Sequence, residues 1–139
     1  GDATSLAHGW ASGATADLSS YVLGVLPATP GFRTWSVRPH PASLGWAEGQ
    51  VPTPHGAIGV RWAQDRPAGR FSLQVVTPAG TRGVVSVPVI RPGSVLTVRS
   101  SGGARSGSVR KTIAAPRGAT DVAVSVVGGP TYDFSVAPG

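Results

Sequence analysis

The acidic side chains are the first candidates for chemistry in this sequence. The 139 residues contain six of them: Asp2, Asp17, Glu48, Asp65, Asp121 and Asp133. Enzymatic cleavage of a glycosidic bond normally needs two carboxyl groups that flank it, one protonated and one ionised. The six acids are scattered along the chain, and no spacing among them places two carboxyl groups face to face. We therefore expect no catalytic residue in this chain.

Nucleophilic, metal and cofactor chemistry lack the patterns that they need. No Gly-x-Ser-x-Gly motif is present, and the glycine-rich stretches lack the ending of a phosphate loop. The three histidines, His8, His40 and His55, match no metal-ligand spacing, and the chain has no cysteine. We expect no metal and no cofactor. His40, between two prolines, and His55, in a proline-rich loop, are predicted to be exposed turn residues.

Tryptophan is the remaining residue type with an obvious use, because the apolar face of a sugar ring can stack on an indole. Trp10, Trp46 and Trp62 are candidates for such stacking. The alternative is that large rings on strands belong to the core. The sequence favours the core for Trp35 and for the pair Trp46 and Trp62, and leaves Trp10 open.

The charge of the chain raises the question of nucleic acid. The formal net charge is +6, from 12 basic and six acidic residues. A phosphate-binding tract usually clusters its cations and interleaves aromatic residues. Here the cations are scattered, and the tightest group, Arg99, Arg105, Arg110 and Lys111, contains no aromatic residue. The pattern favours a solvated basic surface, and nucleic-acid binding is the weakest of the functions considered.

The first part of the chain is predicted to be helical. Between residues 14 and 26, Leu18, Tyr21, Val22 and Val25 recur at helical spacing on one face, and Pro27 would end the helix. An open apolar stripe of four side chains is an association site. We expect these four residues either to fold onto the rest of the chain or to mediate self-association.

After Gly31 the spacing of hydrophobic residues changes from the helical period to a period of two residues. Nine runs separated by Gly and Pro turns predict an antiparallel β-sandwich. The runs are 32–38, 44–51, 57–64, 70–76, 83–89, 94–99, 108–113, 121–127 and 131–136. Residues 77–80 and 128–130 read as hairpin turns. Pairing Val51 with Ala57 would place Trp46 opposite Trp62, and we take that register as the prediction.

Three blocks of sequence resemble bacterial α-L-rhamnosidases. Residues 4–13, with 21–25 and 30–32, look like the end of their catalytic barrel. Residues 44–62 resemble the opening of their C-terminal β-sandwich, and residues 128–134 resemble its final hairpin. The resemblance implies an inverting enzyme with an (α/α)6 barrel whose catalytic acids precede this chain. It also implies that His8 matches a histidine that contacts rhamnose in the intact enzyme.

The sequence thus predicts an all-β sandwich preceded by one N-terminal α-helix. We expect residues 1–30 to be a remnant of the barrel and residues 31–139 to be the sandwich. Since the chain contains no methionine, we expect it to be a processed or excised piece of something longer. The leading hypothesis is a non-catalytic domain that supports the barrel of its parent enzyme. The alternatives are a carbohydrate-binding module that uses exposed Trp and Arg side chains and, more weakly, a nucleic-acid-binding domain.

Overall fold

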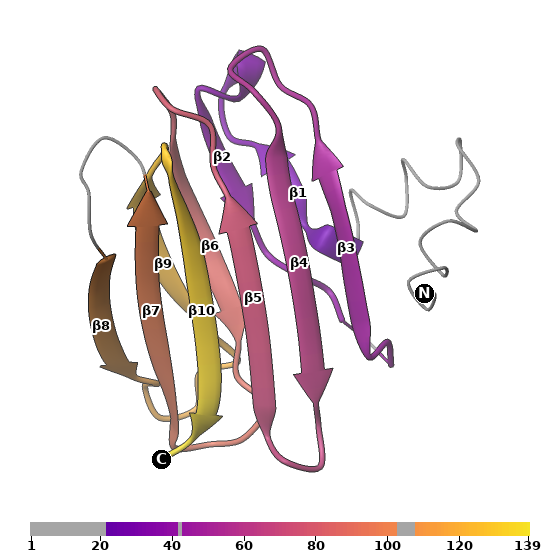
Figure 1. Ribbon diagram of the computed structural model, residues 1–139. Helices are drawn as coiled ribbons and strands as arrows, with labels where there is room; N and C mark the ends of the chain where they lie inside the picture. The colour runs from indigo at the N-terminus through magenta and orange to yellow at the C-terminus, as the bar shows by residue number, and fades with distance from the viewer. Residues whose placement is uncertain (1–21, 42, 103–107) are drawn as a thin grey trace.

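The molecule consists of two β-sheets packed face to face (Figure 1). The structure is a computed structural model, and it describes residues 22–41, 43–102 and 108–139. One sheet has six strands in the order β3-β4-β5-β10-β7-β8, and the other has four in the order β1-β2-β6-β9. The predicted all-β sandwich is confirmed.

All nine predicted strands are present, with ends that differ by a few residues. The six-stranded sheet contains β3 (Trp46–Val51), β4 (Ile58–Asp65), β5 (Arg70–Val76), β7 (Ser94–Gly102), β8 (Ser108–Ala114) and β10 (Pro130–Pro138). The four-stranded sheet contains β1 (Val25–Pro27), β2 (Thr34–Val37), β6 (Arg82–Pro88) and β9 (Asp121–Val127). A short 3-10 segment, η2 (Pro30–Phe32), joins β1 to β2. The prediction did not include β1.

One strand pair departs from the predicted antiparallel arrangement. Strands β2 and β6 run parallel, with Trp35 opposite Gly83, whereas the other pairs in the described part of the chain are antiparallel. Parallel neighbours need a long connection. Here the connection contains β3, β4 and β5, so the chain visits the six-stranded sheet before it returns to lie beside β2.

The helix predicted over residues 14–26 is wrong at its C-terminal end. Val25–Pro27 forms β1, which pairs with β2 at the edge of the four-stranded sheet. Gly24 accounts for the difference, because its φ of 74° lies in the left-handed region that a helix does not use. A Cβ at this position would lie 1.8 Å from the carbonyl oxygen of Arg38. Residues 14–21 of the predicted helix lie outside the described residues.

The residues before β2 therefore belong to the sandwich. Val22, Leu23 and Val25, which precede the predicted boundary between residues 30 and 31, are buried in its core. This burial also bears on the four residues predicted either to fold onto the chain or to mediate self-association. Val22 and Val25 are already covered within the molecule, while Leu18 and Tyr21 lie outside the described residues.

The β3–β4 hairpin is shifted by one residue from the predicted register. Val51 pairs with Ile58, so Trp62 lies opposite Ala47 and Trp46 lies opposite Ala63. A shift of one residue moves a side chain to the other face of its sheet. The prediction that Trp46 and Trp62 are cross-strand neighbours is therefore wrong, since the two indoles lie on opposite faces.

Burial explains why the observed register is the stable one. It places Ala47 beside Trp62 in the core and turns Glu48 outward, opposite Arg61. The predicted register would put Glu48 beside Val60, on the face that packs against the other sheet. Burying a carboxylate without a partner is costly, so the hairpin takes the register that leaves Glu48 in water.

The core between the sheets combines valines with a few large rings. The largest fully buried side chains include Trp35, Trp62, Phe71 and Phe134. Trp62 stacks on Phe71, with 5.7 Å between the ring centroids, and its indole N–H donates a hydrogen bond to the carbonyl oxygen of Val22 (3.3 Å). The prediction that Trp35 and Trp62 belong to the core is confirmed. Trp46 is half-buried on the outer face.

Two connections that were predicted to be hairpin turns instead join the two sheets. Residues 77–81 link β5 to β6, and residues 128–129 link β9 to β10. Thr77 holds them together. Its hydroxyl donates to the carbonyl oxygen of Pro130 (2.7 Å) and accepts from the N–H of Gly129 (2.9 Å). Because buried polar groups must be hydrogen-bonded, this threonine fixes both crossings at one end of the sandwich.

Tyr132 links the two sheets at their rim and gives the fold a pH dependence. Its hydroxyl donates to the carbonyl oxygen of Val127 on β9 (2.6 Å), and burial raises the pKa of its phenol above the usual 10.0. A raised pKa means that the folded state keeps a proton that the unfolded state releases. The resulting stability is fully present below about pH 10 and is lost as the pH rises through the folded-state pKa.

We expect the Tyr132→Phe substitution to remove this dependence. Urea unfolding at a series of pH values would show a free energy that falls above about pH 10 in the natural chain and falls less steeply in the variant. At neutral pH the variant should lose about 1 kcal/mol with the hydrogen bond. Equal slopes in both proteins would contradict a raised pKa at Tyr132.

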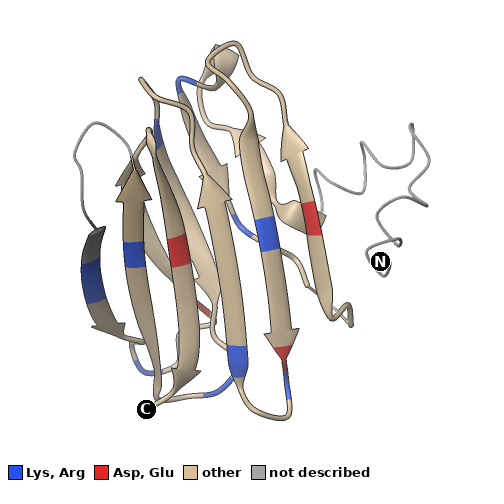
Figure 2. Cartoon of the chain, viewed as in Figure 1, with Lys and Arg blue, Asp and Glu red and all other residues tan. Residues whose placement is uncertain are grey.

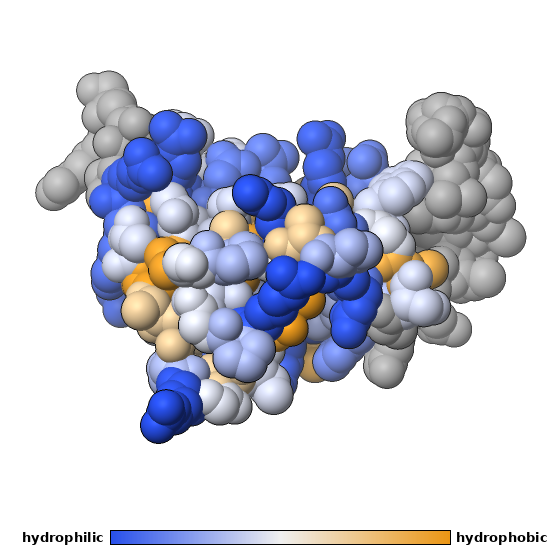
Figure 3. All heavy atoms as spheres, turned by 90° about the horizontal axis from the view of Figure 1, so that it is seen from below, coloured by the Kyte–Doolittle hydropathy of each residue, from blue (hydrophilic) through white to orange (hydrophobic). Residues whose placement is uncertain are grey.

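The surface at the end of the sandwich that holds the β4–β5 turn carries both apolar and hydrophilic side chains. Apolar side chains appear there in small areas among hydrophilic ones (Figure 3). Within the described residues, no helix combines the length and the hydropathy needed to cross a membrane.

Candidate functional site

Six outward-facing side chains form a continuous row across the six-stranded sheet, which we call the polar row. Each member lies directly opposite the next on the neighbouring strand. In strand order from β3 to β8 the members are Glu48, Arg61, Gln74, Asp133, Arg99 and Arg110. Charged bands lie at one level on β3, β4, β10, β7 and β8 (Figure 2). Residues that are far apart in the sequence thus meet because five neighbouring ladders bring them to one level.

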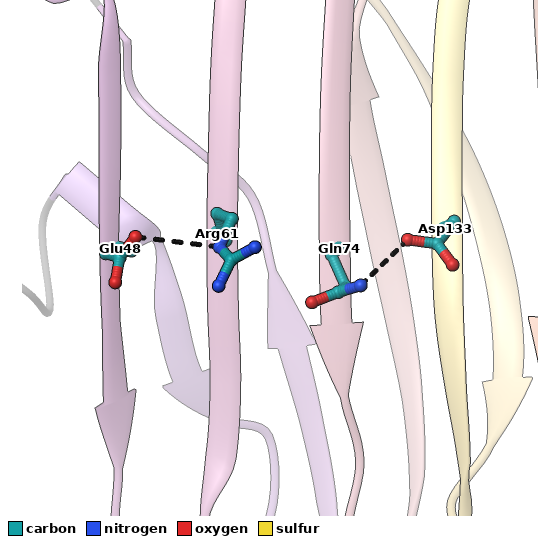
Figure 4. Close-up of polar contacts among 4 residues, drawn as sticks. All are labelled: Glu48, Arg61, Gln74 and Asp133. Carbon is teal, nitrogen blue, oxygen red and sulfur yellow. Dashed lines mark hydrogen bonds and ion pairs between the residues drawn. The ribbon is translucent and has the colours of Figure 1, made fainter. Parts of the chain in front are cut away.

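The polar row is held together by weak contacts. Glu48 Oε1 lies 3.6 Å from Arg61 Nε, and the two side chains are 46% and 66% exposed. Gln74 Nε2 donates a hydrogen bond to Asp133 Oδ1 (3.1 Å) (Figure 4). Solvent-exposed ion pairs of this kind contribute about 0–1 kcal/mol. The row is therefore open to solvent and contributes little to the stability of the sheet.

A shallow hollow runs beside the polar row. The adjacent outward-facing level carries small side chains, with Ala63, Ser72, Ser135 and Thr97 on successive strands. The hollow has a volume of about 340 Å³, and Arg61, Gln74, Asp133 and Arg99 also line it. Trp46 lies opposite Ala63, at the β3 end of this level. The outer face thus combines polar side chains, a floor of small residues and a half-buried indole.

The carboxylates of the polar row are too far apart for glycoside hydrolysis. Glu48 and Asp133 are separated by three strand spacings, since β4 and β5 lie between β3 and β10. Three spacings of about 4.8 Å amount to about 14 Å. The two carboxyl groups of a glycosidase are only about 5–10 Å apart. This pair therefore cannot act as an acid and a nucleophile or base on one bond.

The other two described acids are engaged elsewhere. Asp121, on the four-stranded sheet, forms an ion pair with Arg38, with 2.8 Å between Oδ2 and Nη2. Asp65 closes the β4–β5 turn by accepting a hydrogen bond from the N–H of Ala68 (3.2 Å). In the part of the chain that the structure describes, no three His, Asp or Glu side chains form a group that could hold a metal ion.

The two described residues among the sequence-predicted site residues, Trp46 and Trp62, lie on opposite faces of their sheet. His8 and Trp10 lie outside the described residues. Trp62 is 1% exposed, so its ring is not available to stack on a sugar, whereas the half-buried Trp46 remains a candidate. His40 and His55 are exposed, as predicted.

Sequence reasoning missed the polar row because its register is a three-dimensional property. One signal was present. Glu48 and Arg61 have opposite charges, and pairing them across the hairpin would have given the observed register. The sequence identifies Asp133 only as a candidate acid, and Arg99 and Arg110 only as scattered cations. None of the three has a sequence neighbour that indicates a shared surface.

The four-stranded sheet presents a different outer face. Leu26, Val84 and Val127 are 57%, 41% and 60% exposed there, and they are three of the five large hydrophobic side chains that are exposed in the described part of the chain. Register places Leu26 and Val84 at one level, with Ser36 between them. A shallow hollow of about 330 Å³ lies beside Val84 and Val127, and Arg82 and Ser125 also line it. We call this surface the apolar face.

Comparison with known proteins places the chain in a family. Residues 24–102, more than half of the chain, match the family model described as the bacterial alpha-L-rhamnosidase C-terminal domain. An alpha-L-rhamnosidase from Alteromonas sp. (strain LOR) is 41% identical over 58 residues, which are 41% of this chain and 6% of that protein. The chain therefore spans only a small part of the length of this relative.

Two solved structures share the fold. An alpha-L-rhamnosidase from Dictyoglumus thermophilum has a TM-score of 0.68 and 22% identity, over 88% of this chain and 13% of the other. One from Streptomyces avermitilis, complexed with L-rhamnose, has a TM-score of 0.60 and 21% identity, over 84% of this chain and 10% of the other. Because the family model matches more than half of the chain, the chain belongs to the bacterial alpha-L-rhamnosidase C-terminal domain family.

Proposed function

We propose that this domain is a non-catalytic part of an α-L-rhamnosidase and that it stabilises the catalytic barrel by packing against it through the apolar face. The observation that carries the proposal is the gathering of Leu26, Val84 and Val127 on one face of a domain that has a complete core of its own. An exposed apolar patch on a folded domain marks a site at which another protein surface packs.

The position of β1 supports the same assignment. Strand β1 lies at the edge of the four-stranded sheet, and Leu26 on this strand is part of the apolar face. Residues 4–13, which resemble part of a rhamnosidase barrel, precede this edge strand in the sequence. A barrel would thus be joined to the sandwich through the chain that leads to β1. In such an enzyme His8 would contact the substrate from a loop whose position depends on the sandwich.

Charged substitutions on the apolar face test the proposal in the intact enzyme. We expect Val84→Asp and Val127→Asp to shorten the half-life of rhamnosidase activity at elevated temperature by about tenfold each, since tenfold corresponds to about 1.4 kcal/mol and a buried unpaired carboxylate costs at least that much. Thermal inactivation followed by a rhamnoside assay measures the effect.

Val76→Asp is the matched control, because Val76 is 44% exposed but lies on the outer face of the other sheet. Its activity should decay at the rate of the natural enzyme. All three substitutions should leave the melting temperature of the isolated domain nearly unchanged, since they lie on its surface. If Val76→Asp were as damaging as the other two, or if none had an effect, the apolar face would not be the docking surface.

A further inference from the structure

Arg99 and Arg110 form an unusual pair at one end of the polar row. They lie directly opposite each other on β7 and β8, both are exposed, and neither forms an ion pair with another residue that the structure describes. Like charges directly opposite on a sheet destabilise it. Two arginines at one cross-strand position can both donate to a carboxylate or another oxyanion.

The rest of the polar row is not suited to a simple polyanion. Glu48 and Asp133 carry negative charge at the same level, and each lies directly opposite an arginine. The phosphodiester backbone of a nucleic acid would be repelled by these acids and has no donors to offer them. Sugar hydroxyls both donate and accept hydrogen bonds, so they can satisfy Asp133, Gln74 and Arg61 together.

The shape of the surface fits an extended chain. The polar row crosses six strands, and five strand spacings of about 4.8 Å give a length of about 24 Å. The hollow beside it has a floor of small side chains, so rings of a bound chain can approach the sheet. At the β3 end Trp46 offers part of an indole face, on which a sugar ring can stack.

We propose that the polar row and its hollow bind an acidic oligosaccharide, a chain that contains uronic acid. A carboxylate of the ligand lies between Arg99 and Arg110, its hydroxyls contact Asp133, Gln74 and Arg61, and a ring near the other end rests on Trp46. This site lies on the sheet opposite the apolar face. Binding therefore leaves the proposed barrel contact free, and the result of one test does not decide the other.

Isothermal titration of the chain with an oligosaccharide of defined length that carries one uronic acid among neutral sugars tests the site. We expect saturable binding with a Kd in roughly the micromolar to millimolar range. Arg99→Gln and Arg110→Gln should each weaken it about tenfold, because each removes charge-assisted hydrogen bonds to the carboxylate. Trp46→Ala should weaken it by a similar factor. The fully methyl-esterified oligomer, which lacks the charge, should bind at least about tenfold more weakly.

Arg82→Gln is the matched control, because it removes the same charge from an exposed position on the other sheet. Its affinity should stay within about twofold of the natural chain. An equal loss with Arg82→Gln would show that net charge alone attracts the ligand and would overturn the site. So would an absence of saturable binding, equal affinity for the esterified oligomer, or tighter binding of a single-stranded DNA oligomer. Circular dichroism and thermal melting of each variant confirm that the comparisons use folded protein.

Discussion

The Trp35→Ala substitution is expected to lower the free energy of unfolding of the chain by about 3–5 kcal/mol. Trp35 is 1% exposed and lies between the two sheets. Its ring covers Gly83 on the parallel neighbour β6 so closely that a Cβ there would lie 2.2 Å from Cζ3 of the indole. No larger residue at position 83 would leave room for this ring, so the two residues act as one packing unit.

The indole of Trp35 also holds a buried polar group. Its N–H donates to Thr81 Oγ1 (2.9 Å), and the Thr81 hydroxyl donates in turn to the carbonyl oxygen of Pro78 (2.8 Å). Removing the ring would leave a cavity and an unpaired lone pair on Thr81, which is 2% exposed. Since domains of this size are stable by about 5–15 kcal/mol, this single change removes a large fraction of the total.

Urea unfolding followed by circular dichroism measures the loss, and Trp46→Ala is the comparison. Trp46 is the same residue type on the outer face of a sheet, so its truncation should cost about 1 kcal/mol or less. Equal losses at the two positions would contradict the placement of Trp35 inside and Trp46 outside.

The sequence predicts the strands well because their signal is local. A two-residue period between Gly and Pro turns identifies nine of the ten strands, and Trp35 and Trp62 are correctly assigned to the core. The strand that it misses, β1, has only three residues. Its Val25 also falls at helical spacing from Leu18 and Val22, so the apolar pattern alone does not distinguish a short buried strand from the end of a helix.

The errors about pairing have a different origin. The hairpin register depended on one pair of aromatic residues, and the cost of burying Glu48 outweighs the gain from stacking Trp46 on Trp62. The crossings between sheets after β5 and β9 look like hairpin turns, because Pro and Gly serve both uses. What distinguishes them is the hydrogen bonding of Thr77 to the second crossing, a contact between segments more than 50 residues apart.

The sequence does not predict the polar row as a site. The spacing of the acids predicts no carboxylate pair, and the structure places two strands between Glu48 and Asp133. The polar row itself depends on five registers at once. An error of one residue in any of them would move its members to opposite faces of the sheet.

Hydrolysis of a chromogenic aryl α-L-rhamnoside by the purified chain is the most direct test of a non-catalytic domain. Acid and base groups acting together supply most of the rate of a glycosidase. Glu48 and Asp133, the two carboxylates that share a face, are three strand spacings or about 14 Å apart. An intact α-L-rhamnosidase assayed in parallel shows that the substrate and the conditions support turnover.

We expect the chain to release no chromophore above the buffer rate, at any pH at which it stays folded. Glu48→Gln and Asp133→Asn serve as controls, because they remove the two carboxylates that share a face while changing only exposed or half-buried side chains. Turnover that survives both substitutions would come from a contaminating hydrolase. Turnover by the natural chain that disappears in either variant would contradict a supporting role and show that this sandwich performs the chemistry itself.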